Sequence, residues 1–140
     1  MSSKTNTFET DALKAIFNTD ATGSIEAASI TQMDLNLHVG GFGYDGMTAT
    51  NFPVTYAGYT SVPVGRTTAQ WTISGSTATL ATTVLFPTCW EAYNASASEF
   101  SLSDSNSGGV IYWGSLSTAT MITSGSTPCF LPGSITITED

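Results

Sequence analysis

The chain has 140 residues, which suits a single domain of ordinary size. It carries 3 Lys and Arg residues against 11 Asp and Glu residues, so its formal net charge is −8. Nucleic acids and anionic membrane surfaces both need a basic patch on the protein, and this composition excludes them as partners. No apolar run has the length of a transmembrane segment, and the first six residues lack the apolar core of a signal peptide.

The chain is rich in hydroxyl side chains and poor in charged ones. The sequence contains 24 Thr and 18 Ser, while only 10% of the residues are charged, well below the usual quarter. Disordered chains are poor in aromatic and β-branched residues, whereas this chain is 11% aromatic and rich in Thr. The composition therefore predicts a folded, Thr-rich β domain.

One helix is predicted, over residues 8–17. Asn6 and Glu9 have the spacing of a capping box, and apolar residues recur at intervals of three and four. The predicted apolar stripe consists of Phe8, Ala12, Leu13, Ile16 and Phe17. A helix this short is marginal alone, so it must lie against the domain's own sheet or against a neighbouring subunit.

The rest of the chain shows short strand signals separated by turn residues. Residues 30–39 alternate between apolar and polar side chains with a period of two. Further extended segments are predicted at 59–64, 69–74, 77–86, 99–103, 110–116 and 134–138, with hairpin turns at 75–76 and 104–109.

Turns that recur about every ten residues are typical of an antiparallel sandwich or a small barrel. The predicted fold is mainly β: an antiparallel β-sandwich, jelly-roll-like or a small barrel, with one short N-terminal helix. We expect an N-terminal arm and helix over residues 1–20 and the β-sandwich domain over residues 21–140.

No group of residues indicates catalysis, and we predict that the chain is not an enzyme. His38, the only histidine, lies on the polar face of its strand pattern, and we expect it at the surface or in an interface. A pair of carboxylates could hydrolyse glycosides, but nothing in the spacing of the candidates favours that chemistry. These candidates are Asp34, Asp45, Glu91, Glu99 and Asp104.

Metal and cofactor sites are also not expected. Asp104 and Asn106 offer calcium ligands at alternating positions, but a hairpin turn uses the same residues and is the preferred interpretation. The glycine-rich segment 40–46 lacks the lysine and the following helix of a phosphate-binding loop. Cys89 and Cys129 allow one disulfide, yet without an export signal we expect two buried thiols.

Short segments follow one another in a characteristic order along most of the chain. They are AIFN at 15–18, MDLNLH at 33–38, YAGYTSVPV at 56–64, LFPT at 85–88 before Trp90, EFSLSD at 99–104, GG at 108–109, YWGSL at 112–116, GSTPCF at 125–130 and PGSITIT at 132–138. In this order they resemble a family of small virion proteins of tailed bacteriophages, described as tail-fibre or head-decoration proteins. Glu99 and Ser101 depart from the His and Gly that this family often has.

The resemblance implies a capsid-decorating, or cement, protein on the outer capsid surface of the virion, assembled in the host cytoplasm. Its expected partners are the major capsid protein and itself, as a homo-trimer. The predicted partner contacts are Phe8, Leu13, Ile16 and Phe17. The large aromatic residues expected in the sandwich core or at the trimer axis are Trp71, Phe86, Trp90, Phe100 and Trp113. A hydroxyl-rich exterior with a charge of −8 suits a protein displayed in many copies.

Two alternatives stay open. The chain could be a tail or tail-fibre component that contacts the host surface, with residues 40–46 or 90–97 facing a receptor. It could also be a carbohydrate-binding module or a minor enzyme, and a glycan-array hit centred on Trp90 or Tyr93 would favour this alternative.

Overall fold

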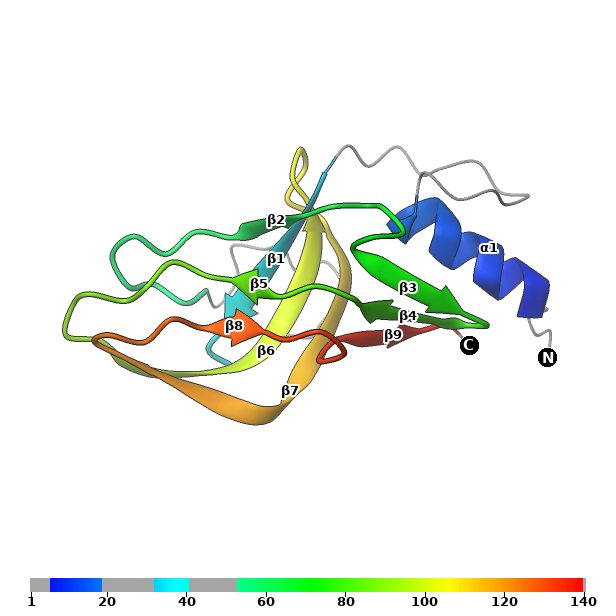
Figure 1. Cartoon of the computed structure of the whole chain (residues 1–140). Coiled ribbons are helices and arrows are strands. Elements are labelled where there is room, and N and C mark those ends of the chain that lie inside the picture. The colour runs from blue at the N-terminus through cyan, green and yellow to red at the C-terminus, as the bar shows by residue number, and fades with distance from the viewer. Residues whose placement is uncertain (1–5, 19–31, 41–52, 140) are drawn as a thin grey trace. The chain divides into compact units, whose positions relative to one another are not determined.

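The computed structural model describes residues 6–18, 32–40 and 53–139, with side chains from residue 9 onward (Figure 1). In chain order the elements are α1 (Asn6–Phe17), β1 (Met33–His38), β2 (Val62–Val64), β3 (Trp71–Ser74), β4 (Thr77–Leu80), β5 (Val84–Leu85), β6 (Asn94–Asp104), β7 (Val110–Thr123), β8 (Cys129–Phe130) and β9 (Thr136–Thr138). The predicted class, a mainly antiparallel β-sandwich with one short helix, is confirmed, and these elements form no closed barrel.

The chain divides into two compact units. The first joins α1 to residues 65–83 and to residues 130–139, and the second contains the described residues within 31–64 and 84–129. The predicted domain boundary, between residues 20 and 21, lies outside the described residues.

The first unit is a small sheet that carries the helix. Its strand order is β3-β4-β9, all antiparallel, and α1 packs on β3 and β4. The turn between β3 and β4 lies at 75–76 as predicted, and Gly75 adopts a φ of 57° that favours glycine. Phe17 on α1 and Trp71 on β3 form the centre of the core, with their ring centroids 4.6 Å apart.

The helix ends at Phe17 as predicted and begins two residues earlier than predicted, at Asn6. Arg66 holds its C-terminal end, because Nε donates to the Ile16 carbonyl at 2.7 Å and Nη2 donates to the Ala15 carbonyl at 2.8 Å. These two carbonyls belong to the last turn, where a helix lacks internal donors and carries partial negative charge. A guanidinium therefore supplies both the hydrogen bonds and the opposite charge.

The predicted apolar stripe of the helix is only partly correct. Leu13 and Phe17 are fully buried, but Ile16 is only half-buried, and the acidic residues Glu9 and Asp11 are buried as well. Periodicity assumes one buried face, whereas burial on this helix falls on every second residue from Glu9 to Phe17.

The second unit is built on a four-stranded antiparallel sheet in the order β2-β1-β6-β7. The period-two alternation predicted for β1 is confirmed, because Met33, Leu35 and Leu37 share one buried face. On β6, Phe100 and Leu102 lie opposite Leu37 and Leu35 and belong to the same apolar face.

Three predicted strands differ from the structure. β6 and β7 extend well beyond the predicted 99–103 and 110–116, into Ala, Ser and Thr residues that carry little apolar signal. The predicted strand 77–86 is instead two strands, because β4 pairs with β9 while β5 pairs with β8.

Candidate functional site

The most exposed large apolar side chain among the described residues is Trp90, with 79% of its surface accessible to solvent. It lies in the Trp90 loop, which we define as residues 86–93, between β5 and β6. Tryptophan side chains are largely buried in most proteins, so the exposure of this indole needs a structural explanation.

Hydrogen bonds fasten the Trp90 loop to the segment that precedes β2. The backbone N–H of Ala57 donates to Oε1 of Glu91 at 2.5 Å, and the N–H of Thr55 donates to the Tyr93 hydroxyl at 3.2 Å. The Tyr56 hydroxyl donates to the Pro87 carbonyl. Residues on both sides of Trp90 are therefore bonded to residues 55–57 of the segment before β2.

A second set of hydrogen bonds fastens the loop to the turn after β7. The N–H of Cys89 donates to the Ser126 carbonyl at 2.8 Å, and the Cys89 carbonyl accepts the N–H of Gly125 at 2.6 Å. The hydroxyls of Thr88 and Thr127 lie 2.6 Å apart. Trp90 thus sits next to a residue whose backbone is bonded on both its N–H and its carbonyl.

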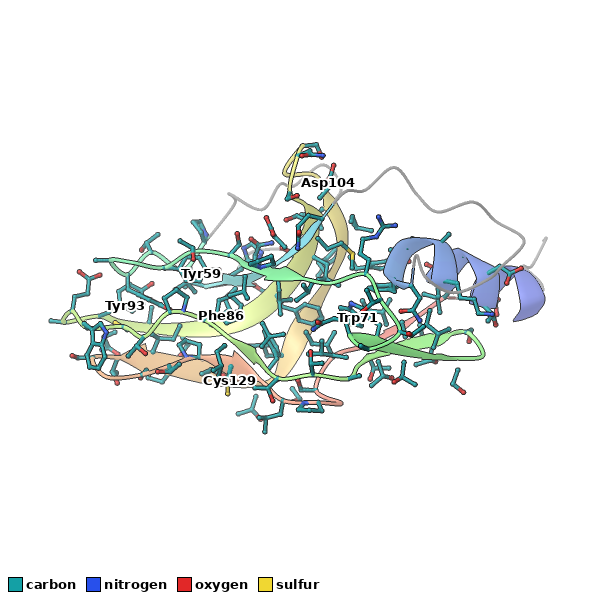
Figure 2. The ribbon with its side chains drawn as sticks, turned by 45° about the horizontal axis from the view of Figure 1, so that its top comes forward. Tyr59, Trp71, Phe86, Tyr93, Asp104 and Cys129 are labelled. Carbon is teal, nitrogen blue, oxygen red and sulfur yellow. The ribbon has the colours of Figure 1, made fainter. Side chains whose placement is uncertain are left out.

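Aromatic rings of the loop and of the segment before β2 form the base of the site; Figure 2 labels Tyr59, Phe86 and Tyr93 among them. Tyr56 packs edge-on against Tyr59 and Tyr93, with centroids 5.4 and 5.6 Å apart, and Tyr59 stacks on Phe86 at 5.9 Å. The Tyr59 hydroxyl accepts the N–H of Leu37 at 2.8 Å, which ties this cluster to β1.

Tyr56 and Tyr59 stay neutral at physiological pH. Desolvation by burial raises the pKa of Tyr59 to about 12; the hydrogen bond with the Leu37 backbone opposes this rise, and Tyr56 and Tyr93 add to it. Burial, together with Cys89 and Tyr93, also raises the pKa of Tyr56. The Tyr56 hydroxyl therefore stays available as a donor to the Pro87 carbonyl, and the Tyr59 hydroxyl stays bonded to the backbone of Leu37.

The arrangement presents one large aromatic ring to solvent on a backbone that is bonded on two sides. Such a ring can insert into a pocket of a partner or stack on a flat ligand, and little conformational entropy is lost because the loop is already ordered. The sequence pattern placed Trp90 in the core or at a trimer axis; the core position is wrong. Trp113, at 49% accessible, is likewise outside the core, whereas Trp71, Phe86 and Phe100 are buried as predicted.

A buried polar cluster lies on the other face of the four-stranded sheet. Nδ2 of Asn36 donates to the hydroxyls of Ser103 at 3.0 Å and Ser101 at 3.3 Å, and Nε2 of His38 lies 2.7 Å from the Ser101 hydroxyl. The predicted surface position of His38 is wrong, because the side chain has no accessible surface. The alternation of β1 correctly predicted on which face of the strand His38 lies, but it could not show that this face is buried.

Sequence reasoning did not connect Ser101 with His38, which are 63 residues apart and become neighbours through the pairing of β1 with β6. A serine hydroxyl bonded to an imidazole is the first half of a nucleophile–base pair. Here both side chains are fully buried, so no substrate reaches the hydroxyl in this structure. The oxygen Oε2 of Glu99, the residue opposite His38, is buried and has no hydrogen-bond partner among the described residues.

The predicted partner contacts on the helix belong to the first unit. Leu13 and Phe17 are fully buried inside that unit, and Ile16 is half-buried. The side chain of Phe8 lies outside the described part of the chain. A role for these residues in binding a partner stays a prediction, and in the single chain Leu13 and Phe17 serve as core.

The structure supports the hairpin interpretation of residues 104–109. Asp104 accepts hydrogen bonds from the Asn106 N–H at 3.2 Å and from the Ser107 hydroxyl at 2.9 Å, and Gly108 adopts a φ of 71°. The Asp104 oxygens therefore serve the turn, which lies at the far end of β6 from the Trp90 loop (Figure 2). The described residues contain no group of three or more potential metal ligands.

Among the candidate carboxylates, Asp34 lies close enough to Asp104 for that charge to affect it. Burial, and secondarily the Asp104 charge, raises the pKa of Asp34 above its usual 3.8. Asp45 lies outside the described residues. No helix among the residues with assigned positions has the length and hydropathy needed to cross a membrane.

Both cysteines are free thiols. The expectation of a buried thiol is correct for Cys89 and wrong for Cys129, which is exposed on β8. Position 129 lies between two buried residues, Pro128 and Phe130, so its side chain is on the exposed side of the alternation.

The chain was also compared with known proteins. No protein-family model matches it, and no curated protein matches its sequence.

Proposed function

We propose that the chain is a non-enzymatic structural protein of a bacteriophage virion that binds the outside of the capsid lattice and stabilises it. The observation that carries this proposal is the exposed Trp90 on a loop bonded at both sides. Tryptophan is among the residues that most often dominate the binding energy of protein interfaces.

The proposed partner is the major capsid protein, which would receive the indole in an apolar pocket. Glu91 beside Trp90 is exposed, and its Oε1 accepts the Ala57 N–H, so this carboxylate is held to the neighbouring segment beside the ring. The hydroxyl-rich remainder of the surface would stay hydrated, and the net charge of −8 would keep decorated particles apart.

This proposal places the capsid contact on the Trp90 loop and not on the apolar face of α1. Leu13 and Phe17 have no accessible surface, whereas most of the Trp90 surface is accessible. Self-association remains part of the proposal, with a homo-trimer as the expected form at three-fold positions of a capsid.

Quantitative mass spectrometry of purified virions from the phage that encodes the chain tests this function. Hundreds of copies per particle are expected for a protein that covers a capsid lattice. A dozen copies or fewer would place it in the tail, and a chain absent from washed particles would contradict a virion role.

A tail component that contacts the host is the second candidate, and one specific observation favours it. Three segments gather around Trp90 at one end of the second unit: residues 53–60, the Trp90 loop and residues 124–127. Clustered loops at one end of a β-sandwich are a common binding arrangement. This candidate predicts that purified protein binds host cells and that Trp90→Ala abolishes the binding; reproducible binding to a glycan array would instead favour the carbohydrate module.

A further inference from the structure

Two long stretches of the chain carry no charge. All 14 charged residues fall outside positions 67–90 and 105–138, although the chain as a whole carries −8. At a symmetry axis each residue meets its own copies, so a charge placed there faces like charges at close range. The axis of a homo-oligomer of this chain is therefore best supplied by the neutral stretches.

The two neutral stretches meet in a short ribbon of the second unit, which we call the β5 ribbon and define as residues 84–89 and 125–129 (Figure 1). The N–H of Phe86 donates to the Pro128 carbonyl at 2.9 Å and sets the pairing of its two segments. The strand β5 also contacts β2, which has no charged residue either. The surroundings of the β5 ribbon in the described chain are therefore neutral on both sides of β5.

The outward face of the β5 ribbon is apolar where its segments pair. Val84 and Phe86 are buried, whereas Leu85 between them is 59% accessible. The bond from Phe86 places Leu85 across from Cys129, which is exposed as well. A leucine and a thiol thus stand side by side in water, and covering them would remove apolar surface from solvent.

Two other exposed apolar side chains, both on β7, suit a symmetry axis less well. Trp113 lies opposite Ser101, and Glu99 follows two residues away on the same face of β6, so an axis there would gather carboxylates. Met121 lies opposite Ser96, whose hydroxyl is directed at the methionine sulfur at 3.9 Å. Neither has a second exposed apolar side chain opposite it.

We propose that three copies of the chain meet through the outward face of the β5 ribbon, with Leu85 and Cys129 next to a three-fold axis. This inference rests on the proposed function for the homo-trimer and names the surface that forms it. The ribbon shares residues 86–89 with the Trp90 loop, so the trimer gathers three such loops around one axis. Three indoles held together bind a lattice more tightly than one, because the second and third contacts are intramolecular.

Chemical crosslinking of the purified full chain tests this arrangement. Cys129 is an exposed thiol and Cys89 is a buried one, so a trivalent maleimide reagent of short reach is expected to react at position 129. The unmodified chain should give a covalent trimer. Cys129→Ser should give no covalent product, while sedimentation velocity still reports a trimer.

A substitution at the axis tests the same surface without crosslinking. Leu85→Lys places three like charges next to the axis and is expected to shift the sedimenting species from trimer to monomer. Met121→Lys is the matched control, since it makes the same change at an exposed apolar side chain outside the β5 ribbon. It is expected to remain a trimer.

Three results would overturn the inference: a monomer or dimer of the unmodified chain at the highest soluble concentration, a trimer that persists in Leu85→Lys, or a trimer that the trivalent reagent fails to join. Crosslinking needs no variant at position 85, so misfolding of Leu85→Lys would leave the inference testable. Binding to stripped virions is measured separately. A monomeric chain that binds them contradicts this inference alone, and a trimer that does not bind them contradicts the proposed function alone.

Discussion

Gly114 on β7 lies directly opposite Phe100 on β6, and the phenyl ring occupies the space beside the glycine. A β-carbon at position 114 would lie 3.0 Å from Cε1 and 3.1 Å from Cζ of Phe100. Phe100 is buried and has little room to move. Glycine at this position is explained by the close approach of the ring.

Gly114→Ala is therefore expected to destabilise the fold by ~1–3 kcal/mol, the usual cost of overpacking a core. Urea unfolding at a concentration where the chain is monomeric measures the change. Combining it with Phe100→Leu, which removes the ring, should give a loss smaller than the sum of the two single losses. Strict additivity would show that the ring is not the obstacle.

Arg66 is expected to stabilise α1 through its two bonds to the last-turn carbonyls. Arg66→Ala should lower the free energy of unfolding by about 1–2 kcal/mol, because charge-assisted bonds at a helix C-terminus are lost. Arg66→Lys keeps the charge but lacks the planar group that makes both bonds. Its free energy of unfolding should therefore lie between those of the unmodified chain and of Arg66→Ala. Thermal unfolding followed by circular dichroism ranks the stabilities of the three chains. A lysine variant as unstable as the alanine variant would contradict this explanation.

Asp34 makes the fold sensitive to pH in a direction opposite to that of a salt-bridged carboxylate. Its pKa is raised in the folded state by burial and by Asp104, so ionisation disfavours folding. This penalty is absent below the usual value of 3.8 and is complete once the pH exceeds the raised pKa. Asp34→Asn should therefore raise the melting temperature at pH 7 and have no such effect at pH 3. An equal shift at both pH values would point to a cause other than ionisation.

The bond from the Ala57 N–H to Glu91 should help to order the Trp90 loop. Glu91→Gln keeps an acceptor oxygen, whereas Glu91→Ala removes it, at a cost of about 1 kcal/mol for a bond of this kind. Hydrogen exchange at the Ala57 amide is expected to accelerate strongly in Glu91→Ala and only slightly in Glu91→Gln. Equal exchange in both variants would mean that the side chain does not hold the segment.

The sequence pattern predicted those parts of the fold in which local chemistry decides the structure. The end of α1, the alternation of β1 and the turn at Gly75 all follow from residue types at fixed spacing. The lengths of β6 and β7 were missed because Ala, Ser and Thr tracts carry no periodic apolar signal.

The candidate site depended on relationships that a pattern does not contain. From sequence alone, Trp90 is predicted to be a core residue. Its exposure follows from a loop that is hydrogen-bonded on two sides to residues more than thirty positions away. The contact between His38 and Ser101 requires the register of β1 with β6. In both cases the missing information is long-range pairing, which single-sequence periodicity does not specify.

The most direct test of the capsid-binding account is co-sedimentation of the purified chain with virions stripped of it. Unmodified protein should saturate the particles, whereas Trp90→Ala should bind at least tenfold more weakly, as expected for loss of roughly 2 kcal/mol at an interface hot spot. Met121→Ala, which removes another exposed apolar side chain, should bind like the unmodified protein. Equal binding by Trp90→Ala and the unmodified chain would contradict the account.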